Sequence, residues 1–165
     1  MAKEPKTLDD LFHDTLKDIY YAEKKIISTL PKLAKAAQSG DLKAAFEKHR
    51  TETERQVERL EQVFALIGKK PQGKTCPAIN GLAEEGAEVI EEYKDSPAID
   101  AGLLAAAQAV EHYEISRYGA LSAWAEELGL SKAVSLLNAT LEEEKATDKA
   151  LTGLADSVIN QKAAA

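Results

Sequence analysis

The stretch Val110–Tyr118, VEHYEISRY, decides the fold, because it places two carboxylates where a packed helix needs apolar side chains. Steps of three and four residues outward from Glu111 follow one helix face: Leu104, Ala107, Glu111, Glu114, Tyr118, Leu121, Ala125 and Leu128. This face is apolar at both ends and carries Glu111 and Glu114 in its middle. Burying unpaired carboxylates is costly, so the fold must supply something that neutralises them.

The composition predicts a single helical domain. The chain has 165 residues and is 44% hydrophobic but only 5% aromatic, a mixture that favours an all-α fold over a sheet. The net charge of −7 argues against nucleic acid and against an anionic membrane surface as partners. The N-terminal MAKEPKTLDD lacks the apolar segment of a signal peptide, and the single Cys76 forms no disulfide framework. We therefore expect a cytoplasmic protein.

The apolar pattern predicts four long helices within a domain that spans residues 1–165. Their expected ranges are about 7–38, 41–67, 97–128 and 131–158. Short turns join the first pair and the last pair, so each pair should form an antiparallel hairpin. The connection 69–96, with a short helix expected over about 81–93, is long enough to run the length of a bundle. The third helix can then lie parallel to the second in a four-helix bundle.

Local signals mark several of these boundaries. Thr7–Asp10 is typical of a capping box, and Gly68 is placed to end the second helix. Ser96 followed by Pro97 predicts the start of the third helix. Pro31 lies inside the first helix and predicts a kink rather than an end.

Every long helix carries an acidic residue in the middle of its apolar face. Glu23 and Glu52 are 29 residues apart in the first hairpin, and Glu111 and Glu144 are 33 apart in the second. Glu114 and Asp148 each lie about one turn from one of these positions. A hairpin brings such positions level, so we expect six acids to meet in the bundle centre. Two metal ions, iron first and manganese as the alternative, would neutralise them, because carboxylates can chelate one ion or bridge two.

Other interpretations of these residues stay open. Any single acid can be solvated or paired with an arginine, and Arg55 and Arg117 are available. His49 and Gln56 lie on either side of Glu52 and could be ligands, hydrogen-bonding partners of a ligand, or core groups. The hydroxyls of Tyr20 and Tyr118 could bond a ligand carboxylate or simply be satisfied within the core.

Four segments resemble one known family. IYYAEKKIISTLPKL (19–33), ETERQVERLEQVF (52–64), VEHYEISRYGAL (110–121) and LEEEKATDKAL (141–151) are similar to the YciF/YciE proteins, bacterial ferritin-like proteins linked to stress responses. The resemblance covers nearly the whole chain. It implies a ferritin-like four-helix bundle with an extra crossover helix and a homodimer. The family has no established biochemical activity.

The acidic pattern is also distantly similar to that of rubrerythrin. Glu111 and Glu114 match a Glu-x-x-Glu motif, but Asp148 stands where a histidine would follow Glu144, and Arg55 stands where one would follow Glu52. This departure implies a site rich in oxygen ligands, with Arg55, Gln56 or His49 near it. No rubredoxin-like cysteine domain is present, so any electron donor would be external.

Two hypotheses follow. The first is a dinuclear metal-binding, ferritin-like stress protein that, if it is an enzyme, oxidises ferrous iron or reduces peroxide. The second is a non-enzymatic structural or assembly protein whose acidic core is vestigial or satisfied by arginine. Arg55 discriminates between them, because a guanidinium among the carboxylates would replace a cation.

Overall fold

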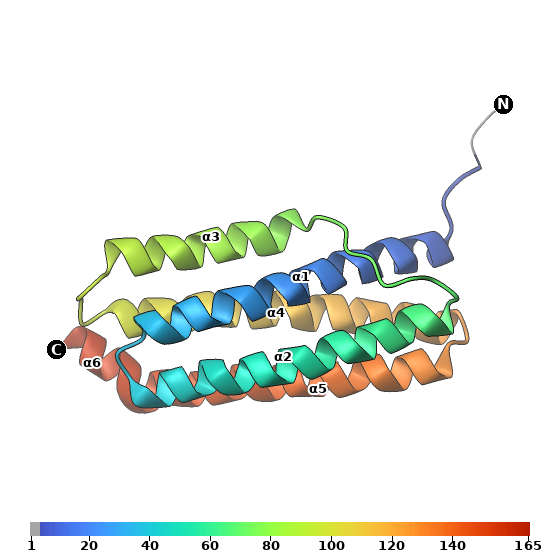
Figure 1. The fold of residues 1–165 in the computed structure, drawn as a ribbon. Helices are drawn as coiled ribbons and strands as arrows, with labels where there is room; N and C mark the ends of the chain where they lie inside the picture. The colour runs from blue at the N-terminus through green and yellow to red at the C-terminus, as the bar shows by residue number, and fades with distance from the viewer. Residues whose placement is uncertain (1–3) are drawn as a thin grey trace.

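A computed structural model describes residues 4–165, and all the regular structure in that range is helical. The elements are α1 (Leu8–Ala36), α2 (Gly40–Leu66), α3 (Pro77–Glu92), α4 (Ile99–Glu127), α5 (Ser131–Leu154), a π-helical segment (Ala155–Ile159) and α6 (Asn160–Ala164). Figure 1 shows the long helices lying side by side along one axis. The all-α prediction is confirmed.

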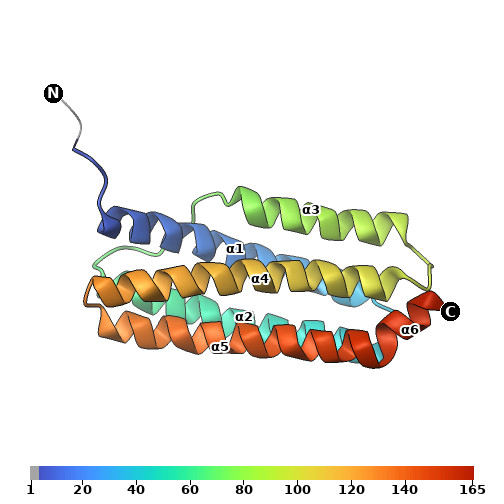
Figure 2. The ribbon, with the colours of Figure 1, turned by 180° about the vertical axis from the view of Figure 1, so that it is seen from behind.

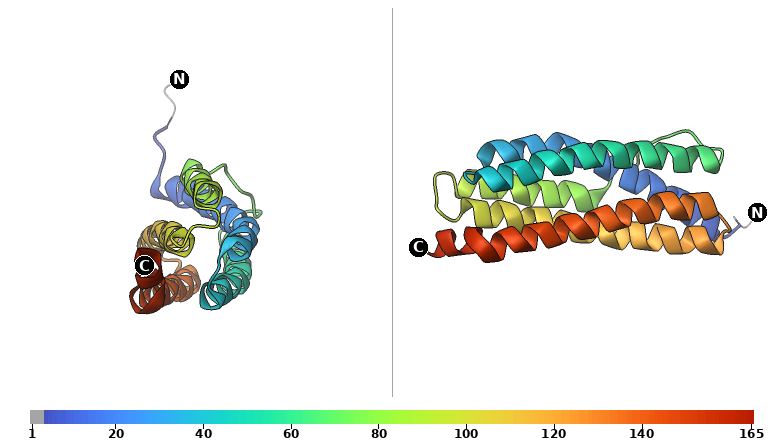
Figure 3. Two further views of the ribbon diagram at one scale, coloured as in Figure 1. Left: turned by 90° about the vertical axis from the view of Figure 1, so that its left-hand side faces the viewer. Right: turned by 90° about the horizontal axis from the view of Figure 1, so that it is seen from below.

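Two helical hairpins make the bundle. α1 packs on α2 and α4 packs on α5, while contacts of α1 with α4 and of α2 with α5 close the ring. The end-on view in Figure 3 shows these four helices around a common centre, with α3 outside them. α3 packs on α1 and α4, and the view from behind in Figure 2 shows it alongside both. The crossover lets α4 run parallel to α2 (Figure 1). This is the expected ferritin-like arrangement.

Several helix ends follow the predicted signals. The Thr7 side chain accepts a hydrogen bond from the Asp10 amide, and the Asp10 carboxylate accepts one from the Thr7 amide at 2.9 Å. Gly68 and Gly129 have φ angles of 67° and 71°, which glycine adopts without a Cβ penalty. α1 continues through Pro31 to Ala36.

Boundaries of α3, α4 and the last long helix differ from the expected ranges, and α1 ends at Ala36 rather than near residue 38. α3 begins at Pro77 rather than near 81, because the Sγ atom of Cys76 caps it by accepting from the Ile79 amide at 3.4 Å. α4 begins at Ile99, because the Ser96 hydroxyl accepts from the Ala98 amide in the preceding turn. The last long helix passes into the wider π turn after Leu154 instead of continuing regularly to 158.

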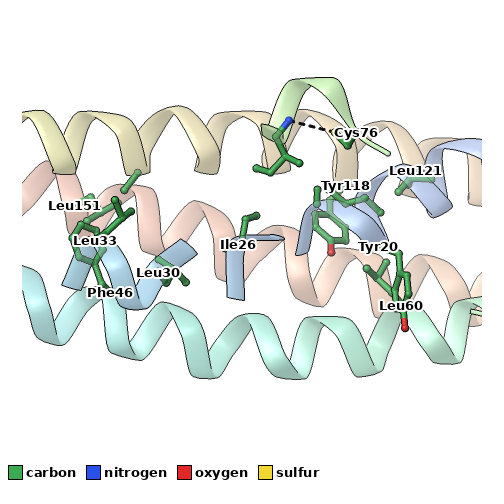
Figure 4. Close-up of a cluster of buried hydrophobic side chains, with 14 of the residues drawn as sticks. Tyr20, Ile26, Leu30, Leu33, Phe46, Leu60, Cys76, Tyr118, Leu121 and Leu151 are labelled. Carbon is green, nitrogen blue, oxygen red and sulfur yellow. Dashed lines mark hydrogen bonds between the residues drawn. The ribbon is translucent and has the colours of Figure 1, made fainter. Parts of the chain in front are cut away.

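The hydrophobic core lies on both sides of a polar middle. Figure 4 shows Leu30, Leu33, Phe46 and Leu151 toward one end, and Tyr20, Leu60 and Leu121 toward the other. Glu23 falls between these groups along α1 and is fully buried. The apolar ends therefore hold the bundle together around the acidic residues.

Within residues 4–165, no helix is long and apolar enough to span a bilayer.

Candidate metal centre

Three helices bring four potential ligands together at the bundle centre. They are His49 from α2, Glu111 and Glu114 from α4, and Glu144 from α5. Each offers one ligand atom, and these atoms all lie within 4.8 Å of one another. All four side chains are buried, at 3% exposure for His49 and 0% for the glutamates. This group can bind a metal ion.

The fourth helix contributes Glu23 beside this group. The Tyr118 hydroxyl, on the same face of α4 as Glu114, donates a hydrogen bond to Oε1 of Glu23. Both side chains are completely buried. Of the alternatives left open for Tyr118, the structure has its hydroxyl bonded to a buried carboxylate, and this contact joins α4 to α1.

His49 faces the carboxylates with both of its ring nitrogens. Its Nδ1 atom lies 2.9 Å from Oε1 of Glu111. Its Nε2 atom lies 3.6 Å from Oε2 of Glu144 and 3.9 Å from Oε2 of Glu114. The imidazole therefore faces carboxylates from both α4 and α5.

Burial and crowding shift the titration of these groups. Burial, aided by the charge of Glu144, raises the pKa of Glu23 to about 7 and places the pKa of Glu114 well above its ordinary value. Burial also raises the pKa of Glu111 to about 9, although His49 opposes the shift. Burial lowers the pKa of His49, but Glu111 and Glu144 outweigh it and raise the value to about 10. Protons therefore balance much of the negative charge when no cation is bound.

Many buried ligand atoms at this site have no hydrogen-bond partner. They are one oxygen of Glu23, Nε2 of His49, Oε2 of Glu111 and both carboxylate oxygens of Glu114 and Glu144, while Oε1 of Glu111 has only the His49 ring nitrogen beside it. Such atoms normally find partners, because an unsatisfied buried polar group is costly. A metal ion would satisfy several of them at once, so the donor set fits a cation.

Glu52, predicted as a ligand, lies outside this group. It is only partly buried, pairs with Lys48 and accepts a 3.4 Å hydrogen bond from the Thr147 hydroxyl. His49, three residues earlier on the same face, takes the central place on α2. The sequence pattern pointed to Glu52 as a ligand and to His49 as a possible one. The position of α2 along the bundle axis, relative to α4 and α5, places His49 and not Glu52 beside their carboxylates.

Asp148 also lies outside the group. Its Oδ1 atom accepts from Gln108 at 3.2 Å and lies 3.2 Å from Nε2 of His112. Four residues advance a helix by more than a full turn and about 6 Å, which carries Asp148 past the level of Glu144. It joins α5 to α4 at the edge of the bundle.

The remaining predicted neighbours have partners of their own. The Tyr20 hydroxyl donates to Glu61 at 2.9 Å, and Gln56 donates to Glu143 at 3.1 Å. Arg55 is exposed, and the guanidinium of Arg117 lies over the Tyr113 ring at 5.3 Å. Neither arginine makes an ion pair with the central carboxylates, so His49 is the cationic group closest to them.

A partly buried ion pair between α2 and α5 was not predicted either. Arg59 of α2 forms a two-pronged ion pair with Glu143 of α5, with both nitrogen–oxygen distances at 2.7 Å. Arg59 also donates to the Thr140 hydroxyl at 3.2 Å. Glu143 is adjacent to Glu144, and the sequence offered no signal that distinguished Arg59 from the other arginines of α2.

Comparisons with known proteins agree with the resemblance seen in the sequence. The chain is 48% identical to Protein YciF of Escherichia coli (strain K12) over 159 residues, which cover 96% of each protein. The solved structure of that stress protein superposes with a TM-score of 0.90, covering 94% of this chain and 99% of the other. YcfI of Rhodopseudomonas palustris, described as a candidate structural protein, is 47% identical with a TM-score of 0.88, covering 92% and 97%.

A more distant structure shares the fold alone. A protein from Xanthomonas campestris is 20% identical and superposes with a TM-score of 0.75 over 94% of this chain and 96% of the other. The family model described as a domain of unknown function, DUF892, matches residues 7–164. With nearly the whole chain matched, and with close likeness to the YciF proteins, the chain belongs to this family of helical, YciF-like proteins.

Proposed function

We propose that this protein binds two metal ions at the bundle centre, iron first and manganese as the alternative, and uses them to handle oxidants during bacterial stress. The supporting observation is the set of buried carboxylate oxygens and one imidazole nitrogen that face one another without hydrogen-bond partners. Iron and manganese suit such a mixture of oxygen and nitrogen ligands.

The proposed ligands are Glu23, His49, Glu111, Glu114 and Glu144. This set keeps four of the six acids that the sequence predicted and replaces Glu52 by His49. Glutamate can bridge two ions, so four carboxylates and one imidazole are enough for a dinuclear site. Bound iron would supply one-electron redox chemistry.

Metal binding at this site would be coupled to the loss of protons from the ligand side chains. Burial raises the pKa values of Glu23, Glu111 and Glu114, so a cation would compete with protons for these carboxylates, because only a deprotonated carboxylate is a good ligand. Tyr118 fixes one oxygen of Glu23 and leaves the other oxygen free. The buried walls exclude bulk water. Oxidation of ferrous iron by peroxide or dioxygen is the reaction class that such a site serves.

A structural role is the second candidate. His49 already compensates part of the negative charge by pairing with Glu111, so the bundle can keep its acidic centre without a metal. The related YcfI is itself described as a candidate structural protein. In this alternative the protein would be a homodimer in the cytoplasm that acts through its outer surface, and the acids would be vestigial.

Metal analysis separates the two candidates. The protein, purified without chelator or affinity metal, is loaded with ferrous iron under anaerobic conditions, and metal is counted per chain. Glu111→Gln keeps the size of the side chain but removes the negative charge. Glu52→Gln is the matched control, because Glu52 lies outside the group. Stoichiometric metal that is lost only in Glu111→Gln supports the metal centre, whereas no bound metal in the wild type supports the structural role.

A further inference from the structure

An apolar cavity lies between the bundle and the crossover helix and reaches the candidate metal centre. Its volume is about 30 Å³. His49 lines it, and apolar side chains make up most of the remaining wall, including Ile26, Leu30 and Leu33 of α1, Ile79 and Leu82 of α3, and Ala107 of α4. The cavity therefore joins the underside of α3 to a proposed ligand.

This wall offers almost no hydrogen bonds to a guest. The hydroxyl of Thr29, one of the polar groups in the lining, donates to the carbonyl of Lys25 at 2.8 Å within its own helix. Nδ1 of His49 faces Oε1 of Glu111, and its Nε2 faces the carboxylates of Glu144 and Glu114 at 3.6 and 3.9 Å rather than an open donor or acceptor on the apolar wall. A buried water requires two to four polar partners, whereas dry apolar cavities accept xenon and similar apolar guests. The space is large enough for a guest about the size of a water molecule.

We infer that this cavity binds dioxygen and delivers it to the metal centre; the inference rests on the proposed function. Dioxygen is small and apolar, so it matches both the volume and the lining. Hydrogen peroxide donates and accepts hydrogen bonds and would leave them unmade here. The cavity thus identifies dioxygen as the oxidant that reaches the site from the α3 side. Bound ferrous iron would supply the two electrons which, with two protons, would reduce dioxygen to hydrogen peroxide.

The crossover helix offers variants that leave every proposed ligand intact. Ala83 of α3 lines the cavity, and Ala83→Leu would fill it. Ala87 is exposed one turn later on the same helix, so Ala87→Leu is the matched control. Gly86 also lines the cavity, and a Cβ there would lie 3.6 Å from Cδ2 of Leu33, an ordinary contact. Gly86→Ala is therefore a milder filling variant if Ala83→Leu does not fold.

Xenon binding tests the cavity without any metal. Crystals or solutions of the metal-free protein are exposed to xenon, and the site is located by anomalous diffraction or by amide shifts in NMR. Xenon should lie between α1, α3 and α4 in the wild type and in Ala87→Leu, and its occupancy should fall several-fold in Ala83→Leu or Gly86→Ala. Xenon that is absent from this place, or found there equally in every variant, would overturn the inference.

Oxidation kinetics test delivery in the loaded protein. The filling variants should raise the dioxygen concentration needed for half-maximal ferrous oxidation several-fold and leave both metal stoichiometry and peroxide-driven oxidation unchanged. Equal dependence on dioxygen in the filling variants and in the wild type contradicts delivery through this cavity. A wild type that binds xenon but no metal contradicts the proposed function, so the two failures are distinguishable.

Discussion

Nδ1 of His49 lies 2.9 Å from Oε1 of Glu111, so a side chain of the first hairpin contacts the middle of the second hairpin at the bundle centre. The residues are 62 positions apart in the chain and both are buried. The acidic face of α4 thus has its nearest cation on α2. This placement makes His49 central to the proposed site. In the sequence, His49, Glu52 and Gln56 lie on the same face of α2, and nothing there singled out His49.

Replacing His49 by Gln should weaken metal binding strongly. Even groups that only support a ligand change affinity by about 10–100-fold when removed, so loss of a proposed nitrogen ligand should cost on the order of 100-fold or more. Titration of ferrous or manganous ion under anaerobic conditions measures the change. Gln56→Ala on the same helix face is the control, because Gln56 bonds Glu143 instead. Equal affinities in these two variants and in the wild type would remove His49 from the ligand set.

A pair of glycine substitutions on α4 tests how the crossover helix packs. A Cβ at Gly102 would lie 2.7 Å from Cγ1 of Val89 on α3, whereas a Cβ at Gly119 would have open space. Gly102→Ala should lower the free energy of unfolding by about 1–3 kcal/mol, because the branched valine must shift. Gly119→Ala should raise it by about 0.5–1 kcal/mol through better helix propensity. Chemical denaturation measures both values, and equal changes would contradict the close packing of α3 on α4.

The stability of the metal-free protein should fall as pH rises. The pKa of Glu23 is raised from 4.5 to about 7 and that of Glu111 to about 9, so the folded state binds more protons than the unfolded state between these values. The stabilisation that each protonated carboxyl contributes is complete below about pH 4.5, the ordinary pKa of a glutamate. It is lost as the pH rises through about 7 for Glu23 and about 9 for Glu111. His49, raised from 6.5 to about 10, acts in the same direction. Glu144 acts oppositely, because His49 overcomes its burial and lowers its pKa, but only below pH 4.5.

Thermal unfolding from pH 5 to pH 9 measures this dependence. The metal-free wild type should lose a few kcal/mol across the range, an order of magnitude given by about 1.4 kcal/mol for each pKa unit. Glu111→Gln cannot ionise at that position and should lose less. Bound metal should reverse the slope, because protons compete with the cation for the same oxygens. If the stability of the metal-free wild type did not change with pH, the raised pKa values of Glu23, Glu111 and His49 would be contradicted.

The sequence predicted the helices well because their signals are local. Capping at Thr7 and the left-handed turn at Gly68 depend on neighbours within a few residues, and both appear in the structure. The central acids Glu23, Glu111, Glu114 and Glu144 were also identifiable, since a charge in the middle of an apolar face is rare unless it is compensated. The hairpin spacing correctly brought Glu111 and Glu144 together, but the same argument wrongly placed Glu52 level with Glu23.

The exact membership of the group could not be predicted, because it depends on how four helices meet. If α2 were displaced by one turn along the bundle axis, Glu52 instead of His49 would lie beside Glu144. No signal within the α2 sequence determines this position along the axis. The ion pair of Arg59 with Glu143 joins α2 to α5 at 2.7 Å and is one contact that sets this position. The sequence also gave no sign of the cavity beneath α3, because a cavity is a property of packing.

Replacing Tyr118 by Phe should separate the role of its hydroxyl from that of its ring. Phenylalanine keeps the buried ring but removes the donor to Oε1 of Glu23, so that carboxylate would keep neither oxygen bonded in the metal-free state. We expect metal affinity to fall about 10–100-fold, as for other supporting groups. Tyr20→Phe is the control, because that hydroxyl bonds Glu61 instead. If both variants bind metal equally to the wild type, Tyr118 is a core side chain with a satisfied hydroxyl and does not position Glu23 for a cation.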